Sequence, residues 1–191
     1  GETTQTIQVV AAGTYSVSTQ NTCAAKSADT ITVSIIPYPV VNLGKDTTIC
    51  MEDTVLLDAG GDAITYLWNT GETTNKIEAL SQNLYSVEAA NGQCKTRDSI
   101  AISVNPLPTI TLTNNTAICL GDILQLNAFG GNSYQWSPAA GLSSAVVSNP
   151  AANPIVTTTY LLLVTDTMTS CFDVDSVTVS VNPIPLINLG N

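Results

Sequence analysis

The sequence lacks histidine altogether and has few charged residues of either sign. Among 191 residues, Lys plus Arg number 5 and Asp plus Glu number 15, so charged residues make up 10% of the chain. An average soluble protein has roughly 25%. Without histidine, a Ser-His-Asp or Cys-His catalytic site and an imidazole metal site are excluded. We therefore expect no enzyme activity and no cofactor or metal.

Positive charge is scarce, and it ends halfway along the chain. The last basic residue is Arg97, and the formal net charge is −10. Such a chain cannot neutralise a phosphate backbone, which excludes nucleic acid as a partner. Long hydrophobic runs are missing too, since no segment approaches the roughly 18 apolar residues of a membrane helix. We expect no direct membrane insertion, while a hydrophobic content of 44% argues against disorder.

An internal repeat organises what is present. Its clearest marker is a Pro-x-Pro string whose first proline follows an aspartate by eight residues, and it occurs three times, with Pro37 and Pro39, Pro106 and Pro108, and Pro183 and Pro185. Other landmarks in the same register are the pairs Trp68 and Trp136, Cys50 and Cys119, and Cys94 and Cys171. We predict the C-terminal half of a repeat at 1–39, complete repeats at 40–108 (the first repeat) and 109–185 (the second repeat), and the first strand of another at 186–191. The chain is then expected to be a window on a longer tandem array.

Period-2 alternation is the dominant local pattern. It runs through segments such as 54–59, 64–68, 84–88 and 99–104, with Gly-Gly and Asn-Gly turns between them. Six or seven short strands in roughly 70 residues predict an all-β fold, with one two-sheet antiparallel sandwich per repeat. Trp68 and Trp136 are interpreted as core residues rather than ligand-stacking ones. The Pro-x-Pro strings are interpreted as short, semi-rigid linkers, the alternative being a proline-rich ligand for a partner domain.

The five cysteines follow the repeat, with one early and one late cysteine in each complete repeat. We predict the disulfides Cys50–Cys94 and Cys119–Cys171, with the partner of Cys23 outside the chain. A zinc site is excluded because there is no Cys-x-x-Cys and no histidine. Disulfides persist in oxidising compartments, so we expect an exported protein.

These landmarks resemble a known kind of repeat. Asp-Thr-Thr-Ile-Cys at 46–50, Tyr-x-Trp-x-Thr-Gly-Glu-Thr-Thr at 66–74 and Val-Asn-Pro-Leu-Pro at 104–108 resemble the PKD-like/immunoglobulin-like repeats of very large Bacteroidota surface proteins, including SprB-type gliding-motility adhesins. The second repeat, with Trp-Ser-Pro-Ala-Ala-Gly-Leu-Ser at 136–143, resembles a longer variant. The resemblance implies tandem immunoglobulin-like/PKD-like sandwiches and export by the type IX secretion system.

The same resemblance implies a modification. Bacteroidota attach O-linked sugars at Asp followed by Ser or Thr and then a hydrophobic residue or Thr. Six candidate acceptors match this pattern: Thr30, Thr47, Thr54, Ser99, Thr167 and Ser176. The alternative is that Asp-Ser/Thr is favourable turn chemistry before a strand.

Acidic residues offer weak candidates for other sites. Adjacent or alternating carboxylates occur at Glu52-Asp53 and at Asp173 and Asp175, where a solvated turn explains them without acid–base chemistry. The best calcium candidate is the segment 58–62, whereas the linkers contain no acid.

The leading hypothesis is a non-catalytic structural stalk of a giant secreted cell-surface adhesin, acting in adhesion or gliding motility. The expected location is the extracellular surface, attached to the outer membrane. Expected partners are neighbouring repeats of the same chain, with surface polysaccharide or other cell-surface proteins as further candidates. The alternative is a carbohydrate-binding or accessory module array of a secreted hydrolase. Carbohydrate binding would need an exposed aromatic platform, for which only Tyr38 or Phe129 is available.

Overall fold

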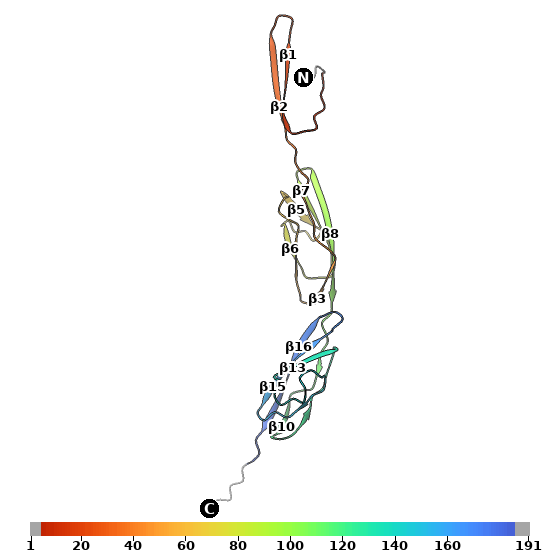
Figure 1. The fold of residues 1–191 in the computed structure, drawn as a ribbon, viewed down its shortest axis with the longest axis vertical. Helices are drawn as coiled ribbons and strands as arrows, with labels where there is room; N and C mark the ends of the chain where they lie inside the picture. Colours follow the sequence, from red (N-terminus) through yellow and green to blue (C-terminus); the bar gives the residue numbers. More distant parts are fainter. Residues whose placement is uncertain (1–4, 186–191) are drawn as a thin grey trace, which may run out of the picture. The chain divides into compact units, whose positions relative to one another are not determined.

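The computed structural model describes residues 5–185, and all of the regular elements in that range are β-strands (Figure 1). None of the described residues form a helix that could span a membrane. The fold is all-β and consists of immunoglobulin-like β-sandwiches. The predicted strand at 186–191 and the first four residues of the predicted piece 1–39 lie outside the described range.

An antiparallel hairpin comes first. It consists of β1 (Gly13–Gln20) and β2 (Lys26–Val33), coloured red and orange in Figure 1. Tyr15 lies opposite Ile31, and Val17 lies opposite Asp29. Val17 and Ile31 are 61% and 64% exposed. The hairpin therefore leaves apolar side chains uncovered.

The first sandwich follows. A four-stranded sheet in the order β3-β8-β7-β5 is accompanied by the two-stranded sheet β4-β6. The strands are β3 (Thr47–Cys50), β4 (Val55–Asp58), β5 (Thr65–Trp68), β6 (Lys76–Ala79), β7 (Asn83–Asn91) and β8 (Cys94–Asn105). The sequence predicts antiparallel sheets, but β3 runs parallel to β8, because it adds to the edge of the sheet beside the last strand of its own repeat.

The second sandwich repeats this order, with β10-β16-β15-β13 as its four-stranded sheet and two-stranded pairs β11-β14 and β12-β9. Its strands are β9 (Thr111–Leu112), β10 (Thr116–Cys119), β11 (Leu124–Gln125), β12 (Ala128–Phe129), β13 (Ser133–Ser137), β14 (Ala151–Ala152), β15 (Thr158–Thr165) and β16 (Phe172–Asn182). Strand β10 is again parallel to the last strand, β16.

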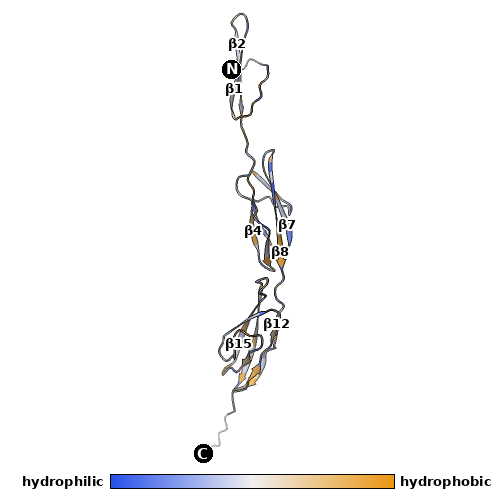
Figure 2. Ribbon diagram, turned by 45° about the vertical axis from the view of Figure 1, so that its right-hand side comes forward, coloured by the Kyte–Doolittle hydropathy of each residue, from blue (hydrophilic) through white to orange (hydrophobic). Residues whose placement is uncertain are grey.

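Alternation along the strands builds both cores. Buried residues alternate with more exposed ones along parts of the long strands β7, β8, β15 and β16, and Figure 2 shows where hydrophobic residues lie along the ribbon. The buried residues of the first sandwich include Leu57, Trp68, Ile77, Tyr85, Val87, Ile100 and Ile102. Those of the second include Leu126, Trp136, Tyr160, Leu162, Val164, Val177 and Val179.

The hairpin has the strand register of the second sandwich's central strands. Tyr160 lies opposite Val177 and Leu162 opposite Asp175, as Tyr15 lies opposite Ile31. Leu162 and Val177 are fully buried, whereas their counterparts in the hairpin are mostly exposed. The hairpin thus has the pairing of a sandwich's last two long strands, but the described residues leave its apolar side chains exposed.

Two compact units share the chain, and the divisions between them fall after Lys45, Val55, Ile77, Asn83 and Ile100. Because these divisions cut across the first sandwich, they do not test the repeat limits. The limits at 39/40, 108/109 and 185/186 stay predictions.

Candidate functional site: the cysteines at the repeat ends

A disulfide joins Cys50, the last residue of β3 in the first sandwich, to Cys171, which immediately precedes β16 in the second sandwich. Their Cα atoms lie 5.6 Å apart, as in ordinary disulfides. Cys171 is fully buried and Cys50 is half-buried. The two residues are separated by 121 positions in the sequence, and closing a loop of that length stabilises the folded state by about 5 kcal/mol in the chain-entropy treatment.

This bond corrects the predicted pairing of Cys50 with Cys94, and the last strand of the repeat gives the reason. Cys94 begins β8, a strand of 12 residues, while Cys50 lies opposite Asn105 at its other end. A strand rises about 3.3 Å per residue, so the two cysteines are separated by roughly 35 Å. Cα atoms more than about 7 Å apart cannot be bridged.

The predicted pair Cys119–Cys171 is wrong for the same reason. Cys171 immediately precedes β16, a strand of 11 residues, and Cys119 lies opposite Asn182, the last residue of that strand. The early and late cysteines of one repeat therefore lie at opposite ends of its sandwich. Cys23, Cys94 and Cys119 are free.

A tight turn holds Cys50 beside the last residue before the linker. The N–H of Cys50 donates to Asp53 Oδ2 at 3.3 Å, and the N–H of Asp53 donates to the Cys50 carbonyl at 3.1 Å. The N–H of Met51 donates to the carbonyl of Asn105 at 2.8 Å. Glu52 has a φ of 73°, in the left-handed region that residues other than glycine seldom adopt.

Cys119 lies in a turn of the same kind, with the same three hydrogen bonds. Its N–H donates to Asp122 Oδ2 at 3.0 Å, and the N–H of Asp122 donates to its carbonyl at 3.0 Å. The N–H of Leu120 donates to the carbonyl of Asn182 at 2.9 Å. Gly121, with a φ of 98°, takes the place of Glu52. Asp53 and Asp122 each follow their cysteine by three residues in the sequence, but their role in holding that cysteine emerges only from the fold.

Cys94 lies at the other end of its repeat, beside the incoming linker. Its Sγ is 3.5 Å from the carbonyl oxygen of Ile36, the residue before the first linker proline. Nearby, the buried side chain of Asn91 donates through Nδ2 to the carbonyl of Pro37 at 3.3 Å and accepts a hydrogen bond from the N–H of Ile64 at 2.9 Å. These contacts hold the linker against the turn that presents Cys94, and sequence patterns did not identify Asn91.

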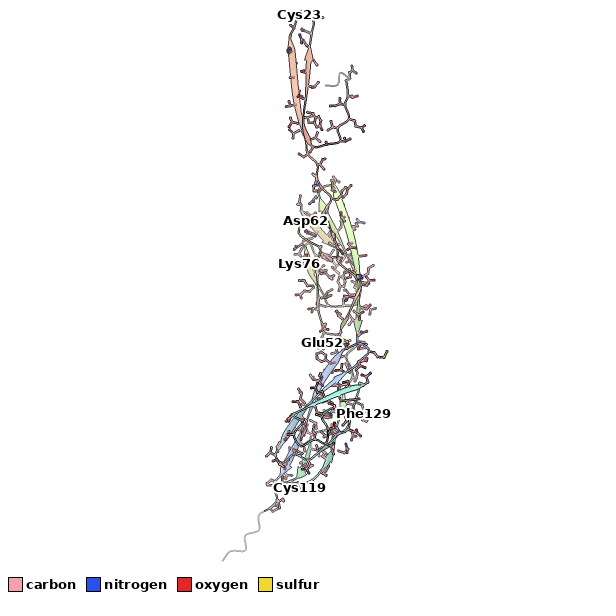
Figure 3. All side chains as sticks on the ribbon, in the orientation of Figure 1. Cys23, Glu52, Asp62, Lys76, Cys119 and Phe129 are labelled. Carbon is pink, nitrogen blue, oxygen red and sulfur yellow. A yellow bond between two sulfur atoms is a disulfide. The ribbon has the colours of Figure 1, made fainter. Side chains whose placement is uncertain are left out.

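Cys23 is exposed in the turn between β1 and β2 (Figure 3). Its N–H donates to Asn21 Oδ1 at 2.9 Å. The equivalent turn of the second sandwich, between β15 and β16, contains Cys171. Cys23 is therefore a late cysteine by position as well as by sequence register.

The two tryptophans occupy equivalent places, on β5 and β13. Trp68 and Trp136 are each 2% exposed. Their indole N–H groups donate to the carbonyls of Thr74 and Val147, both at 2.8 Å. The rings thus fill the interior of each sandwich, and their polar atoms are satisfied within it.

The linker prolines differ by position. The second proline of the first two linkers is buried, and the other four prolines are exposed: the buried ones are Pro39 and Pro108, the exposed ones Pro37, Pro106, Pro183 and Pro185. Each buried proline therefore packs at the start of the segment that follows it, which shortens the free part of the linker.

The candidate acceptors for O-linked sugars lie at the surface, with Thr47 half-buried and the other five exposed: Thr30, Thr54, Ser99, Thr167 and Ser176. In three of them, the backbone N–H donates to the side chain of the preceding aspartate, at 2.8 Å for Thr30, 2.8 Å for Ser99 and 2.7 Å for Ser176. The aspartate thus has a structural role in each case, and the hydroxyl is accessible.

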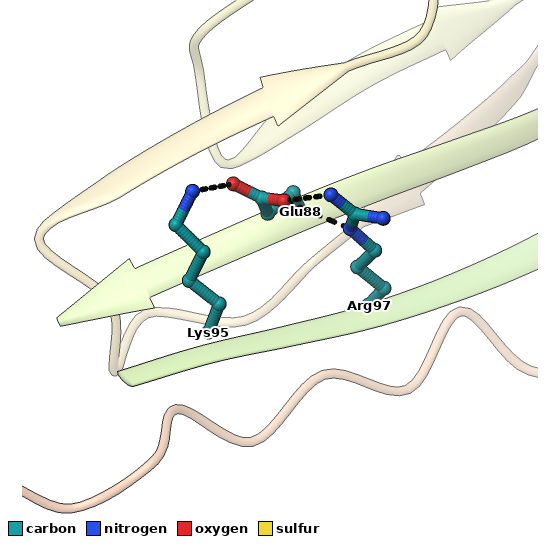
Figure 4. Close-up of polar contacts among 3 residues, drawn as sticks. All are labelled: Glu88, Lys95 and Arg97. Carbon is teal, nitrogen blue, oxygen red and sulfur yellow. Dashed lines mark hydrogen bonds and ion pairs between the residues drawn. The ribbon is translucent and has the colours of Figure 1, made fainter. Parts of the chain in front are cut away.

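Ion pairs in the described residues belong to the first sandwich. Glu88 accepts hydrogen bonds from Lys95 at 2.6 Å and from Arg97 (Figure 4). These two cations lower the pKa of the Glu88 carboxyl. Asp58 lies 2.9 Å from Lys76, which likewise lowers its pKa.

Within residues 5–185, no three side chains of Cys, Asp or Glu come together as potential metal ligands. In the segment 58–62, proposed from the sequence as a calcium candidate, the Asp58 carboxylate pairs with Lys76 instead of with other acidic residues. It also accepts a hydrogen bond from the N–H of Gly60 at 2.9 Å. Tyr38 and Phe129 are 68% and 63% exposed.

No protein-family model and no curated protein matches this chain. Solved structures do match, and tandem immunoglobulin domains are among them. A variant of titin domains I67–I69 is 13% identical, covers 90% of this chain and 75% of its own, and has a TM-score of 0.45. Drosophila OTK extracellular domains 3–5 are 13% identical, with coverages of 90% and 71% and a TM-score of 0.41. Sidekick-1 immunoglobulin domains 1–5 are 13% identical, with coverages of 91% and 46% and a TM-score of 0.36. At this identity the likeness concerns the fold alone.

Proposed function

We propose that the chain is a run of non-catalytic stalk repeats from a secreted cell-surface adhesin, which separates a binding region from the cell. Tandem immunoglobulin-like domains are consistent with a structural or adhesion-type module. The observation that carries the proposal is the disulfide between consecutive repeats. A covalent bond between residues 121 positions apart limits how far the chain can extend under load.

The linkers support the same function. Two prolines in three residues fix φ and cannot donate to a ladder, which favours an extended, semi-rigid joint. Pro39 and Pro108 are buried, so few residues of each linker are free. A joint of this kind transmits force and direction between neighbours better than a glycine-rich linker would.

The hairpin supports a tandem array. Val17 and Ile31 are exposed at positions whose counterparts, Leu162 and Val177, are fully buried in the second sandwich. An isolated two-stranded hairpin is marginally stable in water. We therefore interpret residues 13–33 as the last two long strands of a sandwich of the same kind.

The disulfide also bears on location. Such bonds persist in oxidising compartments, which agrees with export to the cell surface. Attachment to the outer membrane, type IX secretion, a Bacteroidota source and a role in gliding motility complete the proposal, with O-linked sugars on the exposed hydroxyls. Polysaccharide or other surface proteins are the proposed contacts beyond neighbouring repeats.

Single-molecule stretching of the full chain, held at its two ends, tests the mechanical function. With the disulfide closed, the 121-residue separation between Cys50 and Cys171 is excluded from the extension. Because an extended chain spans at most ~3.3–3.6 Å per residue, a reductant should add about 40 nm of contour length. The Cys50→Ser variant should show the long extension without reductant.

An extension that does not change with reductant would overturn the load-limiting function. Binding of the isolated chain to a glycan array, lost on Tyr38→Ala or Phe129→Ala, would instead support a carbohydrate-binding module. The Cys94→Ser variant is the matched control for stretching, because Cys94 has no disulfide partner within the chain.

A further inference from the structure

We propose that the observed disulfide is one rung of a regular series, in which the early cysteine of each repeat bonds to the late cysteine of the next repeat. Cys119 is then the early half of a bond to a following repeat. Cys94 is the late half of a bond to a preceding repeat, and Cys23 is the late half of another. The partner in each case is a cysteine thiol of a flanking repeat of the same kind. The inference rests on the tandem array of the proposed function, though not on its adhesive role.

The turn at Cys119 is the first support. Three hydrogen bonds fix the backbone around Cys119 as they fix it around Cys50, including the bond to the asparagine that precedes the linker. Both cysteines occupy the last position of a strand that runs parallel to the last strand of the repeat. Cys119 is exposed, as an early cysteine without a following repeat would be.

The surroundings of Cys94 are an independent support. Its Sγ lies 3.5 Å from the carbonyl oxygen of Ile36. Ile36 precedes the first linker proline, as Asn105 does in the next linker, and Asn105 is the residue opposite Cys50. The early cysteine of a preceding repeat would therefore lie opposite Ile36, on the residue that Cys94 already touches.

One rule accounts for all of the cysteines. Cys50 and Cys171 are the early and late cysteines for which both repeats are present, and they are bonded. Cys23, Cys94 and Cys119 would each need a partner cysteine that is not among the five in this chain, and they are free. Pairing within repeats would instead leave only Cys23 free, and the length of β8 and β16 prevents it.

Each rung forms by thiol–disulfide exchange with an oxidant of the exported compartment. An oxidised dithiol protein, or oxidised glutathione in vitro, is attacked by one cysteine thiolate and gives a mixed disulfide. The second cysteine then displaces the carrier's sulfur. Two thiols lose two electrons and two protons in total, and the carrier disulfide becomes two thiols.

The decisive experiment extends the chain. A second copy of residues 40–185 follows Pro185 directly, which keeps the register because Val40 follows Pro39. The first copy carries Cys94→Ser, so only the second copy can supply a Cys94 thiol. After oxidation with a glutathione redox buffer, non-reducing peptide mapping should find the first copy's Cys119 bonded to the second copy's Cys94. Two thiols should remain, namely Cys23 and the second copy's Cys119.

Four remaining thiols, or Cys119 bonded to any other cysteine, would overturn the rule. The Cys50–Cys171 peptide from each copy reports whether the extended chain has folded. The unextended chain gives a second measurement, since Cys50→Ser should leave Cys171 unpaired, with four thiols in all. A Cys119–Cys171 bond in that variant would also contradict the rule. If the Cys119–Cys94 disulfide forms between the copies but the contour length on stretching does not change with reductant, the proposed stalk function is wrong and the proposed cysteine pairing is supported.

Discussion

The two sandwiches share a strand order and a register but differ in what stabilises them. The ion pairs found in residues 5–185 lie in the first sandwich, on Asp58 and Glu88. The second repeat contains no basic residue at all. Its longer segment between Trp136 and Tyr160 instead folds back over the core, where Tyr160 is fully buried and donates to the carbonyl of Ala140 at 3.0 Å.

The difference shows which features the fold requires. Charge pairs are present in one sandwich and absent from the other, so they do not specify the architecture. The buried tryptophan, the parallel edge strand and the cysteine turn occur in both. Exposed ion pairs are worth little, whereas a buried aromatic side chain contributes several kcal/mol, and the shared features follow that ranking.

The largest predicted effect concerns the disulfide, which links a cysteine of the first sandwich to one of the second. Cys50→Ser should destabilise the oxidised chain by about 5 kcal/mol, because the unfolded state regains the entropy of a long open loop. Urea unfolding with and without reductant measures this, and reduction of the native chain should give the same loss. Cys94→Ser changes a half-buried cysteine without a disulfide and should leave stability nearly unchanged. An equal loss in both variants would show that packing, not cross-linking, is responsible.

The sequence predicts the fold well because each strand carries its own signal. Alternation in segments such as 84–88 and 99–104 specifies which face is buried, and the structure places Tyr85, Val87 and Ile100 in the core. The repeat register identified the tryptophans and the cysteine positions as equivalent. These features are local, or they recur at a fixed spacing, so one sequence reveals them.

The cysteine pairing could not be predicted in the same way, because it depends on distance in three dimensions. One early and one late cysteine per repeat favour pairing within the repeat when only their number is considered. The parallel pairing of β3 with β8, which places Cys50 opposite Asn105, is not visible in the alternation pattern. The role of Asn91 could not be predicted for a similar reason, since its hydrogen-bond partner Pro37 lies in another segment of the sequence.

The next effect separates the two sandwiches at a glycine that faces the first residue of each predicted repeat. Gly130 has a φ of 121°, and a Cβ there would lie 2.2 Å from the carbonyl oxygen of Thr109. Gly60 has a φ of 85°, and its Cβ would lie 3.4 Å from the carbonyl oxygen of Val40, an ordinary contact. Gly130→Ala should therefore cost about 3 kcal/mol, from left-handed strain plus a backbone clash, and Gly60→Ala about 1 kcal/mol from strain alone.

Hydrogen exchange read by mass spectrometry on peptides of each sandwich checks this difference. Gly130→Ala should lower protection in β12 and its neighbours, while Gly60→Ala should lower protection in the first sandwich more weakly. Equal losses would mean that the backbone at Thr109 moves aside at little cost.

A smaller effect distinguishes the two cysteine turns. Glu52 and Gly121 occupy the same left-handed position, with φ of 73° and 98°. Glu52→Gly should stabilise the chain by about 0.5–1 kcal/mol, because it relieves the strain of a side chain in that region. Gly121→Ala should have the opposite sign and a similar size. Urea unfolding of the two variants beside the native chain measures both, and a destabilising Glu52→Gly would mean that the Glu52 side chain has a stabilising role of its own.

The smallest effect is the pH dependence of stability, which should be larger in the first sandwich than in the second. Lys95 and Arg97 lower the pKa of Glu88 in the folded state, and Lys76 lowers that of Asp58. A carboxyl with a depressed folded pKa contributes stability above its unfolded pKa, roughly 4 for these groups, and loses it as the pH falls through the folded value.

Acidification from pH 6 to pH 3 should therefore reduce hydrogen-exchange protection in β7 and β8 after correction for intrinsic exchange rates. The equivalent strands β15 and β16 have no basic partner in their repeat and should lose less. Glu88→Gln removes the carboxylate that pairs with both Lys95 and Arg97, and it should make the acid responses of the two sandwiches more alike. If β15 and β16 lose protection as steeply as β7 and β8, then carboxyl groups shared by both repeats set the acid response, and the ion pairs of the first sandwich have no part in it.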